Sequence, residues 1–157
     1  MLTPEVLAAL QAAVGAEWCL TGKAELMAYS YDATPLYQRL PDAVVLPRTT
    51  EEVAAVLQIA HQHRIPVFTR GAGTNLSAGT VPAGGGIVLS LNRMNRILEI
   101  DQENLTATAE AGGVTAELHK AVEAVGLFYP PDPGSMTSST LGGNVMESAG
   151  GLRGLKY

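Results

Sequence analysis

The stretch from Ala43 to Arg70 constrains the fold most, because an apolar segment, a strongly marked helix and a second apolar segment follow one another there. Thr49 and Glu52 have the S/T-x-x-E spacing of a capping box, which marks a helix N-terminus. The apolar residues after it fall at i, i+3, i+4 and i+7, the spacing of one buried helical stripe: Val53, Val56, Leu57 and Ala60. Pro66 prevents the helix from continuing. This order predicts a βαβ unit whose two strands are parallel.

Helices and strands alternate along the rest of the chain in the same way. Further helices are predicted at 3–14, 24–29 and 115–125, strands at 43–46, 67–69 and 87–91, and a hairpin at 97–100 and 105–109. The 157 residues are one domain's worth of chain. Together these patterns predict the α+β class, with two small α/β lobes that share an interface.

Composition narrows the kinds of partner and compartment. The net charge is −5, and the Lys and Arg residues form no patch. A nucleic-acid partner is therefore not expected, because neutralising phosphates needs clustered cations. Cys19 is the one cysteine, the N-terminus lacks a signal-peptide pattern, and no apolar run reaches the length of a membrane span. We therefore expect a cytoplasmic protein with no membrane span.

The segment Arg70–Gly79 is rich in glycine and directly follows a predicted strand. Glycine lets the backbone approach a phosphate closely, and successive N–H groups in such a loop form an anion-binding nest. Neither familiar glycine motif fits, because Leu76 occupies the third glycine position of the dinucleotide fingerprint and no lysine stands nearby for a Walker loop. The loop is therefore either an anion site, with Thr74 and Ser77 as hydroxyl donors, or a turn without a ligand. Arg70 either contributes charge or holds the loop.

A second segment, Pro130–Asn144, combines prolines, glycines and small hydroxyl residues. Gly142 and Gly143 permit close backbone contact with a flat or charged ligand. The groups that could hydrogen-bond such a ligand are those of Asp132, Ser135 and Thr140. A segment of this kind inside a compact domain is more often functional than idle, although a plain surface loop is the alternative.

The remaining polar residues predict no catalytic group and no metal site. His61 and His63 are two positions apart on a helix, so their side chains point to different sides and cannot share an ion. His119 stands alone on its helix, and we expect it to be solvated or to cap the helix.

The two glycine-rich segments together resemble the FAD-binding domain of the FAD-linked oxidases of the vanillyl-alcohol oxidase and p-cresol methylhydroxylase type. The resemblance runs through 31–33, 41–53, 70–79 and 129–157, and it is strongest to the glycolate oxidase flavin subunit and D-lactate dehydrogenase. It implies that 1–157 is the N-terminal portion of such a domain, incomplete at its C-terminus. It also implies that the cap domain, which binds the substrate in relatives, lies outside this chain.

The resemblance further implies which residues contact FAD. In the family the first glycine loop binds the pyrophosphate, a residue at Pro47 borders the adenine, and the second segment lines the rest of the cofactor. The residues assigned in this way are Pro47, Arg70, Gly71, Ala72, Gly73, Thr74, Asn75, Leu76, Gly79, Pro131, Asp132, Gly134, Ser135, Thr140, Leu141, Gly142, Gly143 and Asn144. Some relatives tether FAD to a loop histidine; Thr74 stands near that place, which implies non-covalent FAD. Ala78 stands where glycine is frequent, so a positive φ there would strain the loop by about 1–2 kcal/mol.

The implied activity is oxidation of a 2-hydroxy acid, such as glycolate or D-lactate, to the 2-oxo acid with electrons passed to flavin. This chain alone should be inactive, because the substrate-binding residues of relatives lie in the cap. The family implies partner subunits, including an iron–sulfur protein, and unpaired strand edges predict self-association. The alternatives are an alkylglycerone-phosphate synthase or a UDP-N-acetylmuramate-forming reductase on the same scaffold, or a non-catalytic nucleotide-binding module. The reductases match the first glycine loop better than residues 130–144.

Overall fold

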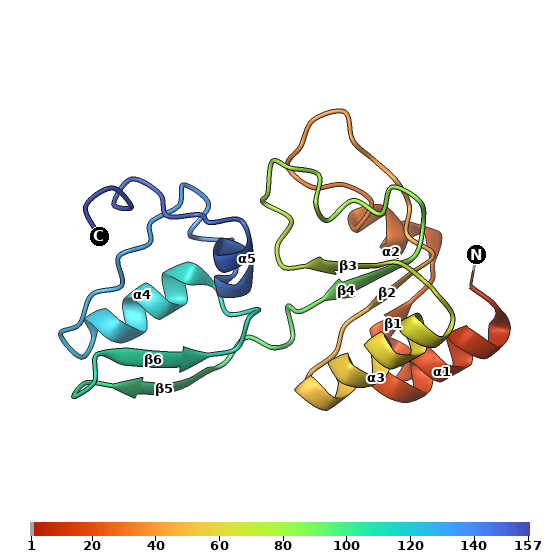
Figure 1. The fold of residues 1–157 in the computed structure, drawn as a ribbon, viewed down its shortest axis with the longest axis horizontal. Coiled ribbons are helices and arrows are strands. Elements are labelled where there is room, and N and C mark those ends of the chain that lie inside the picture. The colour runs from red at the N-terminus through yellow and green to blue at the C-terminus, as the bar shows by residue number, and fades with distance from the viewer. Residues whose placement is uncertain (1) are drawn as a thin grey trace. The chain divides into compact units, whose positions relative to one another are not determined.

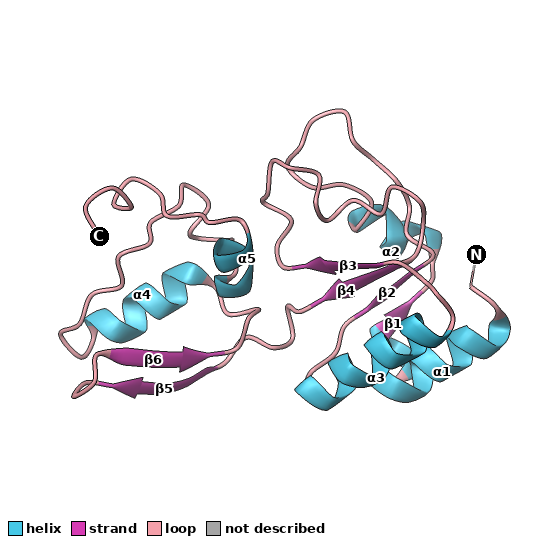
Figure 2. Ribbon diagram, in the orientation of Figure 1, coloured by secondary structure: helices cyan, strands magenta, loops and turns pink. Residues whose placement is uncertain are grey.

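The computed structural model describes residues 2–157, which form two compact units with a boundary between Arg93 and Met94. We call the part up to Arg93 unit 1 and the part from Met94 unit 2 (Figure 1). Each unit combines helices with strands, as the colouring in Figure 2 shows. The predicted α+β class and the division into two small lobes are therefore confirmed.

Unit 1 is built on a four-stranded sheet of order β1-β2-β4-β3. The strands are β1 (Cys19–Leu20), β2 (Ala43–Val45), β3 (Val67–Arg70) and β4 (Ile87–Ser90). β2 and β3 run parallel, as predicted, but each pairs with β4, which lies between them. All four β4 residues are buried, which suits the centre of a parallel sheet covered on both faces. The sequence did not predict β1, a two-residue strand antiparallel to β2.

Helices cover this sheet and form two apolar cores. α1 (Pro4–Val14) and α3 (Thr50–Gln62) lie on one face, and α2 (Lys23–Ala28) lies on the other (Figure 1). The α1–α3 core contains Val6, Leu10, Val14, Val56, Ala60, Val45, Ile87 and Leu89. The smaller core contains Leu26, Val44, Leu46 and Val88. A short 3₁₀ helix, η1 (Ala16–Trp18), follows α1.

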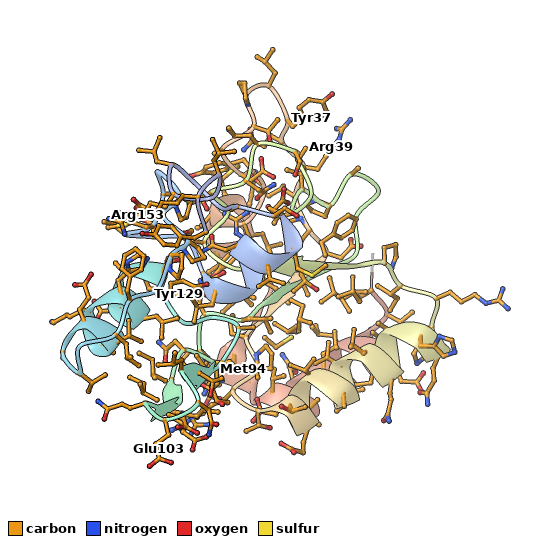
Figure 3. The ribbon with its side chains drawn as sticks, turned by 60° about the vertical axis from the view of Figure 1, so that its left-hand side comes forward. Tyr37, Arg39, Met94, Glu103, Tyr129 and Arg153 are labelled. Carbon is orange, nitrogen blue, oxygen red and sulfur yellow. The ribbon has the colours of Figure 1, made fainter. Side chains whose placement is uncertain are left out.

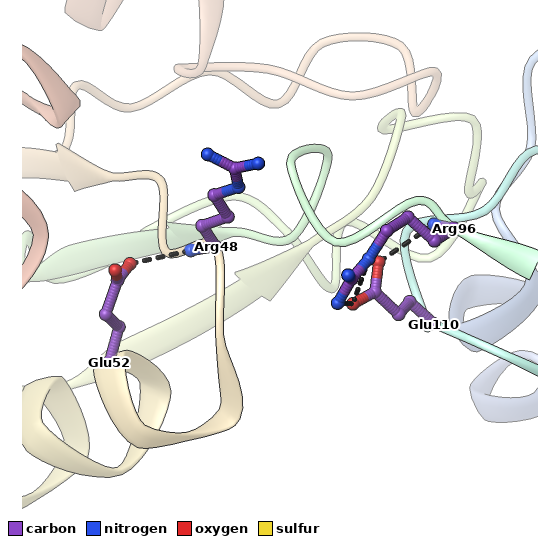
Figure 4. Close-up of polar contacts among 4 residues, drawn as sticks. All are labelled: Arg48, Glu52, Arg96 and Glu110. Atoms are coloured by element: carbon purple, nitrogen blue, oxygen red, sulfur yellow. Dashed lines mark hydrogen bonds and ion pairs between the residues drawn. The ribbon is translucent and has the colours of Figure 1, made fainter. Parts of the chain in front are cut away.

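The predicted helix start at Thr49 is confirmed with one change. The Thr49 hydroxyl accepts a hydrogen bond from the Glu52 N–H at 3.2 Å. The Glu52 carboxylate accepts from the backbone N–H of Arg48, at 2.7 Å (Figure 4). The second bond of the capping box therefore ties the residue before the cap, which fixes the path from β2 into α3.

Unit 2 contains a hairpin and two helices. β5 (Ile97–Asp101) and β6 (Thr106–Ala109) are antiparallel, and α4 (Thr115–Glu123) follows them. At the open end of the hairpin the Arg96 Nη2 and Nε atoms both donate to one carboxylate oxygen of Glu110, at 2.6 and 3.1 Å (Figure 4). The Arg96 side chain is 68% exposed, so this pair fixes the hairpin geometry more than it adds stability.

A short helix, α5 (Leu141–Met146), occupies a stretch where the glycine content gave no clear prediction. The Thr140 hydroxyl caps it by accepting from the Gly143 N–H at 3.3 Å. A Cβ at Gly142 would lie 2.8 Å from the Ala111 Cβ, so glycine lets the helix pack against that residue. Tertiary packing thus overrides the poor helix propensity of two glycines. Within residues 2–157, no helix has the length and apolar character that crossing a membrane requires.

Candidate functional site

The first glycine-rich loop, Arg70–Gly79, leaves the end of β3 and presents backbone donors. Its residues 72–76 give no N–H group to a backbone carbonyl in the part of the chain that the structure describes. Ala72 and Leu76 are exposed, and Gly73 adopts φ 72. Successive backbone N–H groups without backbone acceptors are available to bind an anion. The loop therefore fits a ligand that carries phosphate.

Arg70 holds this loop from beneath. Its side chain is buried, and Nη1 donates to the Tyr31 carbonyl at 2.6 Å and to the Thr80 hydroxyl at 3.2 Å. A Cβ at Gly73 would collide with the guanidinium group and displace it, and the positive φ of Gly73 also favours glycine. Burial lowers the pKa of Arg70, and the negative charge of Asp32 opposes that shift. Arg70 is therefore a buried cation next to the loop, and its charge faces that of Asp32.

Asp32 accepts hydrogen bonds from the loop and from the residue that follows it. Its carboxylate accepts from the Asn75 side-chain amide at 2.8 Å and from the Thr80 hydroxyl at 3.1 Å. It also accepts from the Thr34 backbone N–H at 2.8 Å. Burial acts to raise the pKa of Asp32, but the hydrogen bonds from Thr34, Asn75 and Thr80 outweigh it and lower the pKa below its ordinary value. Asp32 is therefore a charged carboxylate at neutral pH.

Two further hydrogen bonds join residues 31–34 to the loop. The Ala33 N–H donates to the Gly73 carbonyl at 3.0 Å, and the Ala78 N–H donates to the Thr34 hydroxyl at 2.8 Å. Ala78 has φ 55, the strained conformation that was expected if this position required a positive φ. The sequence assigned no role to Asp32, Thr34 or Thr80, although residues 31–33 belong to the stretches that carry the resemblance.

The loop that follows this segment is exposed. Tyr37 and Arg39 project outward between α2 and β2 (Figure 3). Pro47, assigned to the adenine end, is fully buried at the end of β2, so its ring packs inside the chain. Its contact with a cofactor stays a prediction.

The second glycine-rich segment, Pro130–Asn144, is anchored to α4 by a buried polar network. The Thr115 hydroxyl donates to the Ser139 carbonyl at 2.9 Å and lies 3.0 Å from the Ser139 hydroxyl. The Asn144 side-chain amide donates to the same Thr115 oxygen at 2.6 Å. All three side chains are buried, so this network fixes the segment on both sides of Thr140.

His119 also anchors this segment, which corrects the expectation of a solvated or capping histidine. It is 6% exposed, and its Nε2 donates to the Pro131 carbonyl at 2.7 Å. Its ring meets the Tyr129 ring edge to face, with centroids 5.4 Å apart. The hydrogen-bond acceptor lies 12 positions along the chain, which the helical pattern alone does not reveal.

Within the second segment, Asp132 is held by an ion pair and a backbone hydrogen bond, and the backbone at Gly134 is exposed. Asp132 Oδ2 lies 3.3 Å from Arg153 Nε, and the Asp132 N–H donates to the Gly150 carbonyl at 3.0 Å. Arg153, labelled in Figure 3, has its guanidinium carbon 5.1 Å from the centroid of the Phe128 ring. A Cβ on Gly134 would meet nothing within 4 Å, so the backbone there is accessible. Neither glycine-rich segment brings together an acid and a base suited to catalysis, so the chemistry these residues support is binding.

Comparison with known proteins places these features in a family. Residues 41–157 match the family described as FAD binding domain. The chain is 54% identical over 157 residues to glycolate oxidase subunit GlcD of Bacillus subtilis (strain 168), covering 100% of this chain and 33% of that protein. It is 42% identical over 130 residues to a D-lactate dehydrogenase of Anaerostipes hadrus, covering 82% and 27%. It is 37% identical over 157 residues to a D-2-hydroxyglutarate dehydrogenase of Stutzerimonas stutzeri (strain A1501), covering 100% and 34%.

Solved structures show the same fold. A structure of alkyldihydroxyacetonephosphate synthase is similar at a TM-score of 0.89 and 26% identity, covering 100% of this chain and 31% of that chain. A substrate complex of p-cresol methylhydroxylase is similar at a TM-score of 0.79 and 26% identity, covering 90% and 28%. The chain spans no more than 34% of the length of any of the three curated relatives above.

Proposed function

The chain belongs to the FAD-binding domain family of FAD-linked oxidoreductases, and from this premise we propose that it is the cofactor-binding part of an enzyme that oxidises a 2-hydroxy acid to the 2-oxo acid. The observation that carries the proposal is the similarity over the whole chain to a protein named for glycolate. Further relatives are named for D-lactate and D-2-hydroxyglutarate. Each of these three acids carries a hydroxyl beside a carboxylate, which supports this substrate class.

FAD is the cofactor, and we propose that residues 71–76 and Gly79 bind its pyrophosphate through backbone N–H groups. The N–H groups of residues 72–76, which donate to no backbone carbonyl among the described residues, support this role. For the second segment we propose that the backbone at Pro131, Gly134, Gly142 and Gly143 and the side chains of Asp132 and Ser135 contact the remainder of FAD. The loop holds no histidine, and Thr74 forms no ready flavin linkage, so the proposed binding is non-covalent.

When bound, FAD supplies the acceptor for the electrons removed from the hydroxy acid. We propose that the residues of this chain bind and orient the cofactor. Arg70 and Asp32 form long-range hydrogen bonds around the first loop, and the buried network around Thr115 anchors the second segment. We propose that the groups that bind the substrate lie in the part of the whole protein beyond this chain.

We further propose a cytoplasmic enzyme that works with partner subunits, including an iron–sulfur protein. The free, buried Cys19 supports a reducing compartment. Leu152 and Leu155 are almost fully exposed, which supports association of this chain with other polypeptide.

The test is a substrate panel on the full-length protein loaded with FAD. Reduction of an artificial electron acceptor is measured with glycolate, D-lactate, L-lactate and D-2-hydroxyglutarate, and with acetate as a control that lacks the hydroxyl. We expect turnover with at least one hydroxy acid and none with acetate. Bound FAD without turnover on any hydroxy acid would refute the substrate class and leave the family assignment intact.

A second candidate is another reaction on the same scaffold. The similarity of the whole chain to alkyldihydroxyacetonephosphate synthase structures favours keeping it in the test. The same panel separates the two, because an enzyme of that kind would not reduce the acceptor with a 2-hydroxy acid.

A further inference from the structure

The segment Tyr31–Thr34 contacts the first glycine-rich loop through a set of long-range hydrogen bonds. The Tyr31 carbonyl accepts from Arg70, and the Ala33 N–H donates to the Gly73 carbonyl. The side chains of Asp32 and Thr34 accept hydrogen bonds from Asn75 and Ala78 of the loop. The bonded residues are 39 to 48 positions apart in sequence. We call these four residues the clasp.

We propose that Asp32 and Thr34 of the clasp are positioning residues, which hold residues 73–80 in the conformation that binds the FAD pyrophosphate. This inference rests on the proposed role of the loop in FAD binding. Neither side chain needs to touch the cofactor, because each acts through loop atoms.

The charge of Asp32 alone would oppose binding of an anion at the loop, so its presence there points to another role. A carboxylate beside an anion-binding loop repels the anion unless its charge is compensated. Arg70 supplies that compensation by its proximity, while the carboxylate oxygens are occupied by Asn75, Thr80 and the Thr34 N–H. A carboxylate accepts several hydrogen bonds at once, which no neutral side chain of this size does equally well. The ability of a carboxylate to accept these hydrogen bonds together explains why an acidic residue stands beside the loop.

Thr34 supports the conformation of Ala78. Its hydroxyl accepts from the Ala78 N–H and also interacts with the Asp32 carboxylate. Ala78 has a positive φ, which a residue with a side chain adopts at a cost. Without the Thr34 acceptor this conformation loses its partner, and the loop populates other conformations. A binding-competent state that is only partly populated lowers the apparent affinity by the same fraction.

The matched pair Thr34→Val and Thr34→Ser tests the inference. Valine keeps the shape and removes the hydroxyl, whereas serine keeps the hydroxyl. Thr34 is only half-buried, so both variants should fold, and thermal unfolding of each apoprotein checks this. FAD and riboflavin, which lacks the pyrophosphate, are each titrated into the full-length apoprotein. We expect Thr34→Val to weaken FAD binding at least tenfold, Thr34→Ser to stay within about threefold, and riboflavin affinity to be unchanged in both.

Asp32→Asn provides a second variant, since it keeps the shape but offers one acceptor oxygen in place of two. It should weaken FAD binding in the same direction and leave riboflavin binding unchanged. Wild-type FAD affinity in both Thr34→Val and Asp32→Asn would overturn the inference, as would an equal loss for FAD and riboflavin. Failure of the wild-type protein to bind FAD would instead overturn the proposed role of the loop, so the two failures are distinguishable.

Discussion

The two glycine-rich segments are held in place by different kinds of side chain. In unit 1 the loop is held by charged groups, the buried Arg70 beneath it and the Asp32 carboxylate of the clasp. In unit 2 the buried contacts of the segment are made by neutral groups, the hydroxyls and amide that meet at Thr115, and the ion pair of Asp132 with Arg153 is partly exposed. The bonds in unit 1 go mostly to the loop itself, whereas those in unit 2 bind its ends to a helix.

This difference indicates how each unit should respond to change. Charged groups near an anion site tune the affinity for the anion and respond to pH. A fully buried neutral network contributes to stability, because any member left without a partner remains buried and unsatisfied. Changes in the first loop should therefore show mainly in cofactor binding, and changes around Thr115 mainly in folding.

The largest expected effect is on unit 2. Thr115→Val removes the hydroxyl that meets Ser139 and Asn144, which leaves their buried groups without partners. We expect it to lower the free energy of unfolding by about 2–3 kcal/mol, measured by urea denaturation. Thr115→Ser, which keeps the hydroxyl, should lose only about 1 kcal/mol. Equal losses in the two variants would show that the network does not stabilise the unit.

Gly73→Ala tests the expected response of the loop in unit 1. Gly73 has φ 72, and a Cβ there would collide with Arg70. We expect a loss of about 2 kcal/mol in stability from the backbone strain and the displaced guanidinium. FAD affinity should fall more steeply than stability, as measured by titration of the apoprotein. Unchanged FAD binding would contradict the proposed role of the loop.

The pH dependence of the unfolding free energy distinguishes the two regions further. Because the pKa of Asp32 is lower in the folded protein than in the unfolded chain, Asp32 stabilises the fold above its unfolded pKa of about 3.9. That contribution is lost as the pH falls through the lower folded pKa. The difference in unfolding free energy between pH 7 and pH 3 should therefore be smaller in Asp32→Asn than in the wild-type protein. The same difference should be unchanged in Thr115→Ser, because the Thr115 network holds no titrating group.

The smallest effect is expected from Ala78→Gly. Glycine relieves the strain of φ 55, which is about 1–2 kcal/mol, but adds freedom to the unfolded chain that costs about 0.5–1 kcal/mol. A net stabilisation of about 0–1.5 kcal/mol should appear as a small rise in Tm. A clear loss of stability would show that the alanine methyl group makes contacts that favour the loop.

The secondary structure was predictable where it depends on neighbouring residues. The helix after Thr49 and the hairpin of β5 and β6 follow from local spacing and capping, and both are found. The position of β4 between β2 and β3 was not predictable, because sheet order depends on contacts distant in sequence. The helix α5 was unclear for the same reason, since its stability depends on the packing of Gly142 against Ala111.

The candidate site was predictable only in part. The glycines of both segments stand out because few residues adopt such backbone conformations. Asp32 and Thr34 were overlooked because their partners lie more than 40 positions away, at Asn75 and Ala78. His119 was assigned wrongly because nothing near it in sequence identifies the Pro131 carbonyl as its acceptor.

The measurement that tests the central claim most directly is the visible absorption spectrum of the full-length protein after incubation with FAD and gel filtration. The account predicts that flavin bands elute with the protein, and that Gly73→Ala elutes with much weaker bands. A folded wild-type protein that elutes colourless would contradict the claim that this chain binds FAD.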